Sequence, residues 1–251
     1  MRKLMQSLAR RLLPAANLEI NLPTGIHVPV GSRDQISRFE EIFLAKSYDE
    51  ILDRIPLPET VCDLGCNAGY FPLAIEDRKR RHSQTMTTRY VCVDANPACV
   101  EIARRSMSKN IAAGNWWVGQ GCIGEPGQEM CFHLSKADAH SSVMNKYSFL
   151  RTVSMKALDL QALFEKQFPS GIDLLKVDVE GAEKFLVMSW GPTLSKFCRR
   201  LMVEHHPFCG LSALEFSNRL TELGFIPELF RPEETGEQVG LFLNKAKAQV
   251  K

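Results

Sequence analysis

Residues 61–70 read VCDLGCNAGY: a short apolar run that ends in an acid, two glycines four residues apart, and a helical pattern that begins at Tyr70. In a doubly wound α/β sheet, ligands bind beyond the carboxyl ends of the strands, where such a turn leads into a helix. Gly65 and Gly69 would allow the tight turn and a close approach of the backbone to the ligand. The free N–H groups at the helix start would bind a carboxylate, and Asp63 an adjacent ammonium group.

A second acid, Asp94, ends the next expected strand, which covers residues 90–94. Because the tips of neighbouring parallel strands meet, its carboxylate would lie beside the first turn and accept hydrogen bonds from both hydroxyls of a ribose. Ala95, Asn96 and Pro97 then open the next helix, with Asn96 as its N-cap. One strand end thus offers a site for a carboxylate and an ammonium group, and the next offers a site for a ribose. Together they predict S-adenosylmethionine as the ligand.

The spacing of the glycines bears on the class of nucleotide. A dinucleotide-binding turn has the pattern Gly-x-Gly-x-x-Gly, and Asn67 stands where its second glycine would be. A side chain at that position obstructs the approach of a pyrophosphate. The turn therefore favours a methyl donor, with an NAD-dependent oxidoreductase as the alternative.

The rest of the chain alternates between strand-like and helical patterns. The expected strands cover residues 60–64, 90–94, 116–119, 172–179, 200–204 and 240–243, and the expected helices cover residues 70–78, 97–111, 158–167, 182–190 and 211–223. This alternation predicts a doubly wound, Rossmann-like α/β domain with a mostly parallel sheet and helices on both faces. We assign the domain to residues 59–251, after a helical lead-in over residues 1–58. Residues 131–156 break the rhythm as a hairpin or loop, and the basic segment 78–89 is expected to be a solvated loop.

A second motif, IDLLKVDVEG at residues 172–181, alternates Lys176, Asp178 and Glu180 with apolar residues. A central strand of a parallel sheet is normally apolar throughout, and buried charges without partners are costly. We therefore expect these charges to emerge together at the strand tip, into a polar cleft. The next strand ends in Glu204 and His206, which would join them, and a histidine beside carboxylates is a candidate general base.

Three motifs together resemble the FkbM family of class I S-adenosylmethionine-dependent methyltransferases. They are Asp63-x-Gly65-x-Asn67-x-Gly69-Tyr70-Phe71, Leu175-Lys176-Val177-Asp178-Val179-Glu180-Gly181-Ala182-Glu183 and Val203-Glu204-x-His206, with a weaker extension to Ser142 and Val153–Asp159. The resemblance implies a cofactor site made of Asp63, Gly65, Asn67, Gly69, Tyr70, Asp94, Ala95 and the Cys122–Ile123 backbone. It implies an acceptor site made of Lys176, Asp178, Glu180, Glu204 and His206. Two departures are Asn96-Pro97, where many relatives have Glu-Pro, and Cys66 in place of a small residue.

The expected reaction is O-methylation of a hydroxyl on a small molecule, sugar or natural product, by in-line displacement at the sulfonium methyl. An alcohol is a poor nucleophile at neutral pH, so His206 or Asp178 would assist its deprotonation. Asp178, Glu180 and Glu204 also offer hard oxygen ligands for Mg²⁺, but the sequence leaves metal dependence undecided and we assign no metal site.

The composition is that of an ordinary globular protein, with 45% hydrophobic and 24% charged residues, and the net charge of +2 gives no electrostatic case for a nucleic-acid partner. An RNA methyltransferase remains an alternative because residues 78–82 and the N-terminus are basic, and a non-catalytic scaffold is a third possibility. No apolar run is long enough to cross a bilayer, and Met1–Leu13 is expected to be a short amphipathic helix. The eight cysteines include no Cys-x-x-Cys pair, which favours reduced thiols and a cytoplasmic location.

Overall fold

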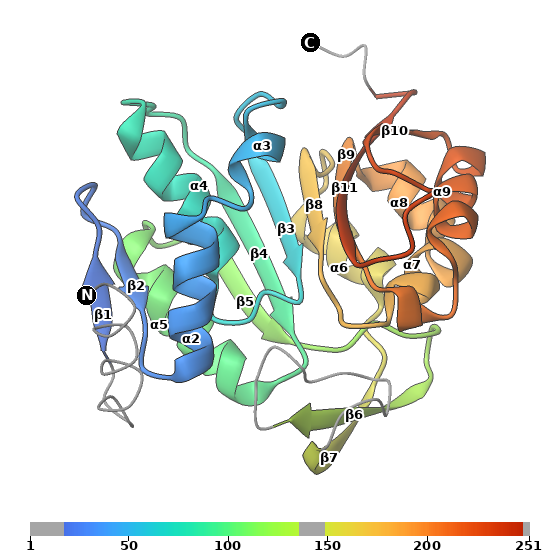
Figure 1. Cartoon of the computed structure of the whole chain (residues 1–251), viewed down its shortest axis with the longest axis horizontal. Helices are drawn as coiled ribbons and strands as arrows, with labels where there is room; N and C mark the ends of the chain where they lie inside the picture. Colours follow the sequence, from blue (N-terminus) through green and yellow to red (C-terminus); the bar gives the residue numbers. More distant parts are fainter. Residues whose placement is uncertain (1–17, 136–148, 248–251) are drawn as a thin grey trace.

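A seven-stranded sheet, in the order β10-β11-β9-β8-β3-β4-β5, forms the centre of the computed structural model (Figure 1). Its strands are β3 (Thr60–Leu64), β4 (Arg89–Asp94), β5 (Trp116–Gln120), β8 (Leu174–Val177), β9 (Arg200–His205), β10 (Phe225–Leu229) and β11 (Gln238–Asn244). The structure describes residues 18–135 and 149–247. The predicted helix over Met1–Leu13 and the family-like Ser142 lie outside these described residues.

The central part of the sheet is parallel. Strands β9, β8, β3, β4 and β5 pair in parallel, whereas β11 is antiparallel to both β9 and β10. The strand order reverses between β3 and β8, because the chain adds β4 and β5 on one side of β3 and later adds β9 beside β8. The mostly parallel, doubly wound sheet is therefore confirmed, and its topological switch point lies between β3 and β8.

Helices cover both faces of the sheet (Figure 1). One face packs on α4 (Tyr70–Arg81) and α5 (Pro97–Asn110), and the other on α6 (Leu160–Gln167), α7 (Glu183–Ser189), α8 (Gly191–Phe197) and α9 (Ala213–Glu222). Alternate strand residues enter the two cores, as the two-residue period of a strand requires. Val61 packs in the core on the α4 side, whereas Cys62 and Leu64 pack in the core on the α6 side.

The segment before β3 packs on the α4 side of the sheet. It contains the hairpin of β1 (Glu19–Asn21) and β2 (His27–Pro29), helix α2 (Arg33–Phe39), a π-helical turn over Glu40–Leu44 and the short helix α3 (Asp49–Leu52). The predicted helical lead-in is thus wrong for residues 19–29. From residue 26 to residue 30, Ile26, Val28 and Val30 are buried at every second position, which is the period of a strand and not of a helix.

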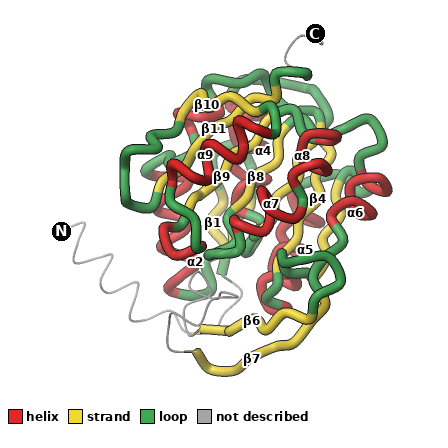
Figure 2. The backbone as a smooth tube through the Cα atoms, turned by 90° about the vertical axis from the view of Figure 1, so that its right-hand side faces the viewer, coloured by secondary structure: helices red, strands yellow, loops and turns green. Residues whose placement is uncertain are grey.

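A second hairpin, β6 (Glu129–Ser135) with β7 (Phe149–Lys156), lies apart from the sheet, on the side where its parallel strands end (Figures 1 and 2). It confirms the hairpin alternative for residues 131–156. Met130, Phe132 and Leu134 on β6 form a small apolar cluster with Ala95 and Cys122. The hairpin therefore packs over the carboxyl ends of β4 and β5.

Several element boundaries differ from the predicted ones. Strand β8 ends at Val177 instead of continuing to residue 179, so Asp178 and Glu180 lie in the loop that follows it. Helix α4 continues to Arg81, into the segment predicted as a solvated loop. Strand β10 was not predicted, because Pro227 and exposed neighbours interrupt its apolar pattern; proline is tolerated there because β10 is an edge strand.

Candidate active site

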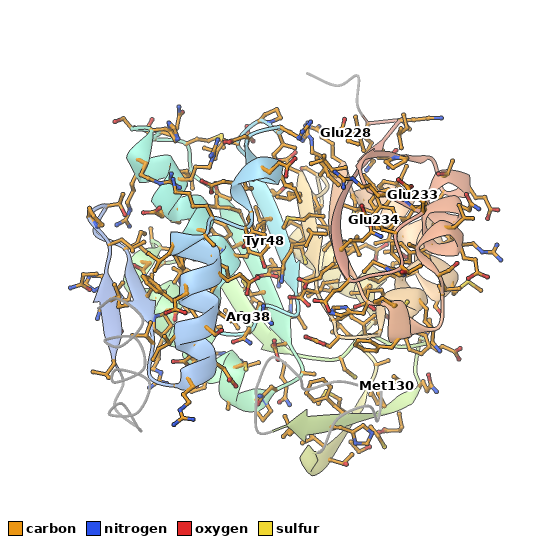
Figure 3. The ribbon with its side chains drawn as sticks, in the orientation of Figure 1. Arg38, Tyr48, Met130, Glu228, Glu233 and Glu234 are labelled. Carbon is orange, nitrogen blue, oxygen red and sulfur yellow. The ribbon has the colours of Figure 1, made fainter. Side chains whose placement is uncertain are left out.

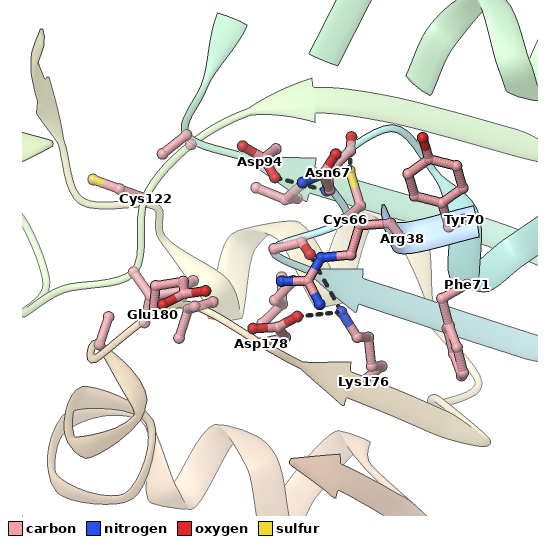
Figure 4. Close-up of a pocket in the computed structure, with 18 of the residues that line it drawn as sticks. Arg38, Cys66, Asn67, Tyr70, Phe71, Asp94, Cys122, Lys176, Asp178 and Glu180 are labelled. Carbon is pink, nitrogen blue, oxygen red and sulfur yellow. Dashed lines mark hydrogen bonds and ion pairs between the residues drawn. The ribbon is translucent and has the colours of Figure 1, made fainter. Parts of the chain in front are cut away.

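A cavity opens at the carboxyl ends of β3, β4, β5 and β8, beside the switch point. Most residues predicted to hold a cofactor line it: Gly65, Asn67, Tyr70, Asp94, Ala95, Cys122 and Ile123. Asp63 and Gly69 are buried behind that lining. On the predicted acceptor side, Lys176, Asp178 and Glu180 line the same cavity, whereas Glu204 and His206 do not. Figure 4 shows Asp94 and Asp178 on different walls of this cavity.

The Asp94 carboxylate is fixed by two backbone donors at the tip of β4. The N–H of Asn67 donates to Oδ2 at 2.8 Å (Figure 4), and the N–H of Asn96 donates to Oδ1 at 2.8 Å. Each oxygen keeps a further lone pair for a ligand. Burial raises the pKa of Asp94 to about 6, although the two N–H donors favour the ionised form. At neutral pH Asp94 is therefore an oriented carboxylate acceptor.

The turn between β3 and α4 is built on left-handed residues. Gly65 and Gly69 both have φ of +81°, and Asn67 has φ of +48°, with its side-chain oxygen accepting the N–H of Ala68 at 2.7 Å. Asparagine is one of the few residues that adopt this conformation readily. A Cβ on Gly65 would lie 1.6 Å from the backbone oxygen of Asp178. Glycine is therefore needed here because the loop after β8 approaches closely, not only for a ligand.

Asp63 and Lys176 form a buried ion pair across the switch point. They are register partners on β3 and β8, and the Lys176 Nζ lies 3.4 Å from Asp63 Oδ1 and 3.2 Å from Asp178 Oδ2. Asp63 is fully buried, and neither of its carboxylate oxygens accepts a hydrogen bond from the described residues. Burial raises the pKa of Asp63, an effect that the Lys176 charge opposes. Asp63 therefore does not line the cavity, but it holds Lys176, which does.

Asp178 and Glu180 follow β8 in a loop with strained backbone. The N–H of Asp178 donates to the Leu64 carbonyl at 2.9 Å, which ties the loop to β3, and Glu180 and Gly181 have φ of +49° and +99°. A left-handed glutamate is uncommon and is held in place by its surroundings. Burial disfavours the ionised form of Asp178, but Lys176, His206 and Arg38 outweigh it and lower the pKa of Asp178. Burial and the Asp178 charge raise the pKa of Glu180 to about 7.

Glu204 and His206 lie directly behind this loop, at the end of the neighbouring strand β9. His206 is buried, with Nδ1 2.9 Å from Glu183 Oε1 and Nε2 3.6 Å from Glu180 Oε2. Burial alone would lower the pKa of His206, but Glu183, Glu180 and Asp178 raise it to about 9. Burial and the Asp178 charge raise the pKa of Glu204 to about 9. The predicted gathering of these charges at two neighbouring strand tips is thus observed.

Part of this group has donor atoms at metal-ligand spacing. One atom each from Asp178, Glu204 and His206 lie within 4.8 Å of one another. The sequence offered Asp178, Glu180 and Glu204 as oxygen ligands for Mg²⁺ without assigning a site; the set at this spacing contains His206 in place of Glu180.

Two polar residues of the cavity were not identified from the sequence. Arg38 on α2 and Tyr48, just before α3, both line it from the N-terminal segment (Figure 3). The Arg38 guanidinium pairs with Glu41 at 2.8 Å and lies close to Asp178 (Figure 4). The ring of Tyr48 packs edge-on against Phe71 with centroids 5.1 Å apart. The sequence pattern predicted helix in this region but gave no signal for the face that turns to the sheet.

Three of the four cations at the end of α4 are paired with acids. Arg78 pairs with Asp53 at 2.5 Å, Lys79 with Glu76 at 2.6 Å, and Arg81 with Asp77 at 2.9 Å, while Arg80 donates to the carbonyls of Thr24 and Asn110. The prediction of a solvated loop is wrong for residues 78–81. These contacts to the helix's own acids and to the N-terminal segment prolong the helix.

The sheet order, the antiparallel β11 beside β9 and the cavity at the switch point define a Rossmann-like domain of the class I methyltransferase type. The model of the methyltransferase FkbM domain matches residues 63–227, which is well over half of the chain. The chain therefore belongs to the FkbM methyltransferase family. Among the residues that the structure describes, no helix combines the length and apolar character needed to span a membrane.

Solved structures similar to this chain include several methyltransferases. A TehB-like SAM-dependent methyltransferase from Corynebacterium glutamicum is 12% identical, with 84% of this chain and 96% of that chain covered and a TM-score of 0.44. The N-terminal domain of EvdMO1 with SAH bound is 13% identical, with 97% and 96% covered and a TM-score of 0.47. The O-methyltransferase from Bacillus cereus in complex with SAH is 12% identical, with 96% and 88% covered and a TM-score of 0.41. No curated protein matches the chain.

Proposed function

We propose that this protein transfers a methyl group from S-adenosylmethionine to a hydroxyl group of a small molecule. The observation that carries the proposal is a single cavity whose walls bring together an oriented carboxylate at the tip of β4 and the ionisable loop after β8. The first is suited to a ribose, and the second to an acceptor that must lose a proton.

The residues at the β3 and β4 tips fit S-adenosylmethionine. Both Asp94 oxygens are already aligned by backbone donors and can accept hydrogen bonds from two ribose hydroxyls. Lys176 lines the cavity beside the β3–α4 turn and offers a cation for the methionine carboxylate, while Asp63 holds Lys176 in place. Cys122 and Ile123, at the end of β5, give the apolar part of the wall that an adenine ring needs.

When bound, S-adenosylmethionine supplies an electrophilic methyl group: the acceptor oxygen forms a bond to the methyl carbon while the carbon–sulfur bond breaks, leaving S-adenosylhomocysteine. The acceptor proton passes to a protein carboxylate. We assign this role to Glu180, because it lines the cavity and Asp178 is held in an ion pair by Lys176. His206, the base suggested by the sequence together with Asp178, lies behind the lining, where it orders the carboxylates.

Two observations favour this reaction over the alternatives. Family membership and the left-handed Asn67, whose side chain occupies the position of the second dinucleotide glycine, favour a methyl donor over NAD. Three of the four cations over residues 78–81 are paired with acids, and Arg80 donates to backbone carbonyls, which favours a small acceptor over RNA.

The test is a Glu180→Gln variant assayed with S-adenosylmethionine and a panel of hydroxylated sugars and phenols, with S-adenosylhomocysteine formation as the readout. Loss of a general base typically costs about 10²–10⁴-fold in rate. We expect kcat to fall within that range while the affinity for S-adenosylhomocysteine changes less than about twofold. The matched control is Glu165→Gln, an exposed carboxylate on α6, which should leave kcat unchanged. Full activity of Glu180→Gln on the substrate of the wild-type protein would refute the assignment.

A further inference from the structure

Carboxylates in the cavity wall and behind it surround the imidazole of His206. The His206 Nε2 lies 3.6 Å from Glu180 and 3.9 Å from Glu237, and donor atoms of Asp178, Glu204 and His206 lie within 4.8 Å of one another. A ligand atom sits about 2.0–2.6 Å from a divalent cation, so two ligands of one ion are separated by at most about 5 Å. The three donors are therefore close enough to share one ion once their side chains close in on it.

The tautomer of His206 is set by an independent contact. Its Nδ1 lies 2.9 Å from Glu183 Oε1, and Glu183 is fully buried and also accepts the N–H of Gly181 at 3.1 Å. Because a carboxylate accepts hydrogen bonds, Nδ1 carries a proton. Metal binding would displace the proton on Nε2, which faces the cluster from a side chain that is only 2% exposed; its nearest carboxylate oxygen among the described residues lies at 3.6 Å, beyond hydrogen-bond distance. A carboxylate that holds the outer nitrogen of a histidine is the usual support of a metal-ligating imidazole.

The charge balance also points to a cation. The carboxylates of Asp178, Glu180, Glu183, Glu204 and Glu237 all lie in this small region. Lys176 pairs with Asp178, Arg38 lies nearby, and the His206 imidazole is a third basic group, so the five acids outnumber these three basic groups. Like charges brought together in a partly buried site repel strongly, and a bound cation removes that repulsion.

We propose that Asp178, Glu204 and His206 bind one divalent first-row transition-metal ion, such as Mn²⁺, in the wall of the cavity. An imidazole nitrogen with two carboxylate oxygens favours such ions over Mg²⁺, which prefers oxygen ligands alone. Three protein ligands leave coordination positions open, and Asp178 brings the ion to the cavity wall. There it would bind the acceptor hydroxyl and ease its deprotonation. The metal site rests on its own donor geometry, whereas its role at the acceptor hydroxyl rests on the proposed function.

The test is titration of the metal-free full-length protein with Mn²⁺, followed by electron paramagnetic resonance, with Zn²⁺ and Mg²⁺ as competitors. We expect one Mn²⁺ per chain, displaced by Zn²⁺ and only weakly by Mg²⁺. The affinity should fall at least tenfold in Glu204→Gln and in His206→Ala, while Glu165→Gln should leave it unchanged. Glu183→Gln should lower it less, because it keeps an acceptor for Nδ1.

The affinity for S-adenosylhomocysteine, measured on the same samples, separates this proposal from the proposed function. Protein that binds S-adenosylhomocysteine but neither Mn²⁺ nor Zn²⁺ at millimolar concentration would overturn the metal site alone. Mn²⁺ binding that survives both Glu204→Gln and His206→Ala would also overturn it, as would binding of Mg²⁺ in preference to Mn²⁺. Glu204→Gln preserves side-chain volume, so it decides the question if the buried His206→Ala variant does not fold.

Discussion

At the scale of single residues, the burial of Asp94 links ligand binding to pH. Its pKa is raised to about 6 by burial, against the opposing effect of the Asn96 and Asn67 N–H groups. The ionised carboxylate accepts hydrogen bonds from two ribose hydroxyls, whereas protonation removes one acceptor. Affinity for S-adenosylhomocysteine should therefore be constant above about pH 7 and fall as the pH drops through 6, approaching tenfold per pH unit. Calorimetric titrations between pH 5 and 8 measure this dependence.

Asp94→Asn provides the control for that pH profile. The variant should bind more weakly at pH 7.5 and lose most of the dependence on pH, because its amide does not titrate. An unchanged affinity of the wild-type protein between pH 5 and pH 7.5 would show that Asp94 does not contact the ligand.

Because the loop after β8 approaches Gly65 closely, we expect substitution of Gly65 to lower the free energy of unfolding. Gly65→Ala places a Cβ 1.6 Å from a backbone oxygen and forces alanine to φ of +81°. Gly127→Ala is the matched control, since its φ is +77° but no atom lies within 4 Å of the added Cβ. The left-handed backbone alone costs about 1–2 kcal/mol, so Gly127→Ala should lose about that much and Gly65→Ala clearly more. Urea unfolding of the two variants gives the comparison, and equal losses would count against the role of the Asp178 contact.

Single residues also show how far the sequence predicts the site. Asp94 and Asp178 are predictable because an acid at the end of an apolar strand of a parallel sheet lies where such sheets bind their ligands. Arg38 and Tyr48 are not, because their cavity-facing direction depends on how the N-terminal segment packs, which no local pattern encodes. Glu183 was noted only as part of a family motif. Its role could not be predicted, because its contact with His206 joins α7 to the end of β9 across 23 positions of the chain.

At the scale of elements, the ends of helices give the clearest link between sequence and stability. Helix α9 begins with a capping box, in which Ser212 Oγ accepts the N–H of Glu215 and the Glu215 side chain accepts the N–H of Ser212. Ser212→Ala should lower the free energy of unfolding by about 1 kcal/mol. Ser108→Ala on α5, where the exposed hydroxyl bonds only within its own helix, should lower it by much less. Chemical denaturation measures both, and an equal effect of the two changes would argue against the cap.

Elements with a clear period were predictable, and those that depend on partners were not. The alternation of buried and turn-forming stretches predicted six of the seven strands of the sheet. Strand β10 was not predicted because it is an edge strand in which only Phe225 is deeply buried. It is stabilised by pairing with β11 and has no alternating apolar pattern of its own. The β1–β2 hairpin has too few residues for an alternating pattern to stand out from a helical one.

At the scale of the whole molecule, the cavity joins the two halves of the sheet, because Asp94 comes from the β3–β4–β5 side and Asp178 from the β8–β9 side. A ligand that contacts both halves binds only the folded chain and must stabilise it. At a concentration of about 100 times its Kd, S-adenosylhomocysteine should add about 2.7 kcal/mol to the free energy of unfolding. For a protein of this size that corresponds to a rise in Tm of roughly 5–10 °C. NAD at the same concentration should leave Tm unchanged, and Asp94→Asn should reduce the rise. A larger rise with NAD than with S-adenosylhomocysteine would mean that the cavity serves a dinucleotide, and the proposed methyl transfer would have to be abandoned.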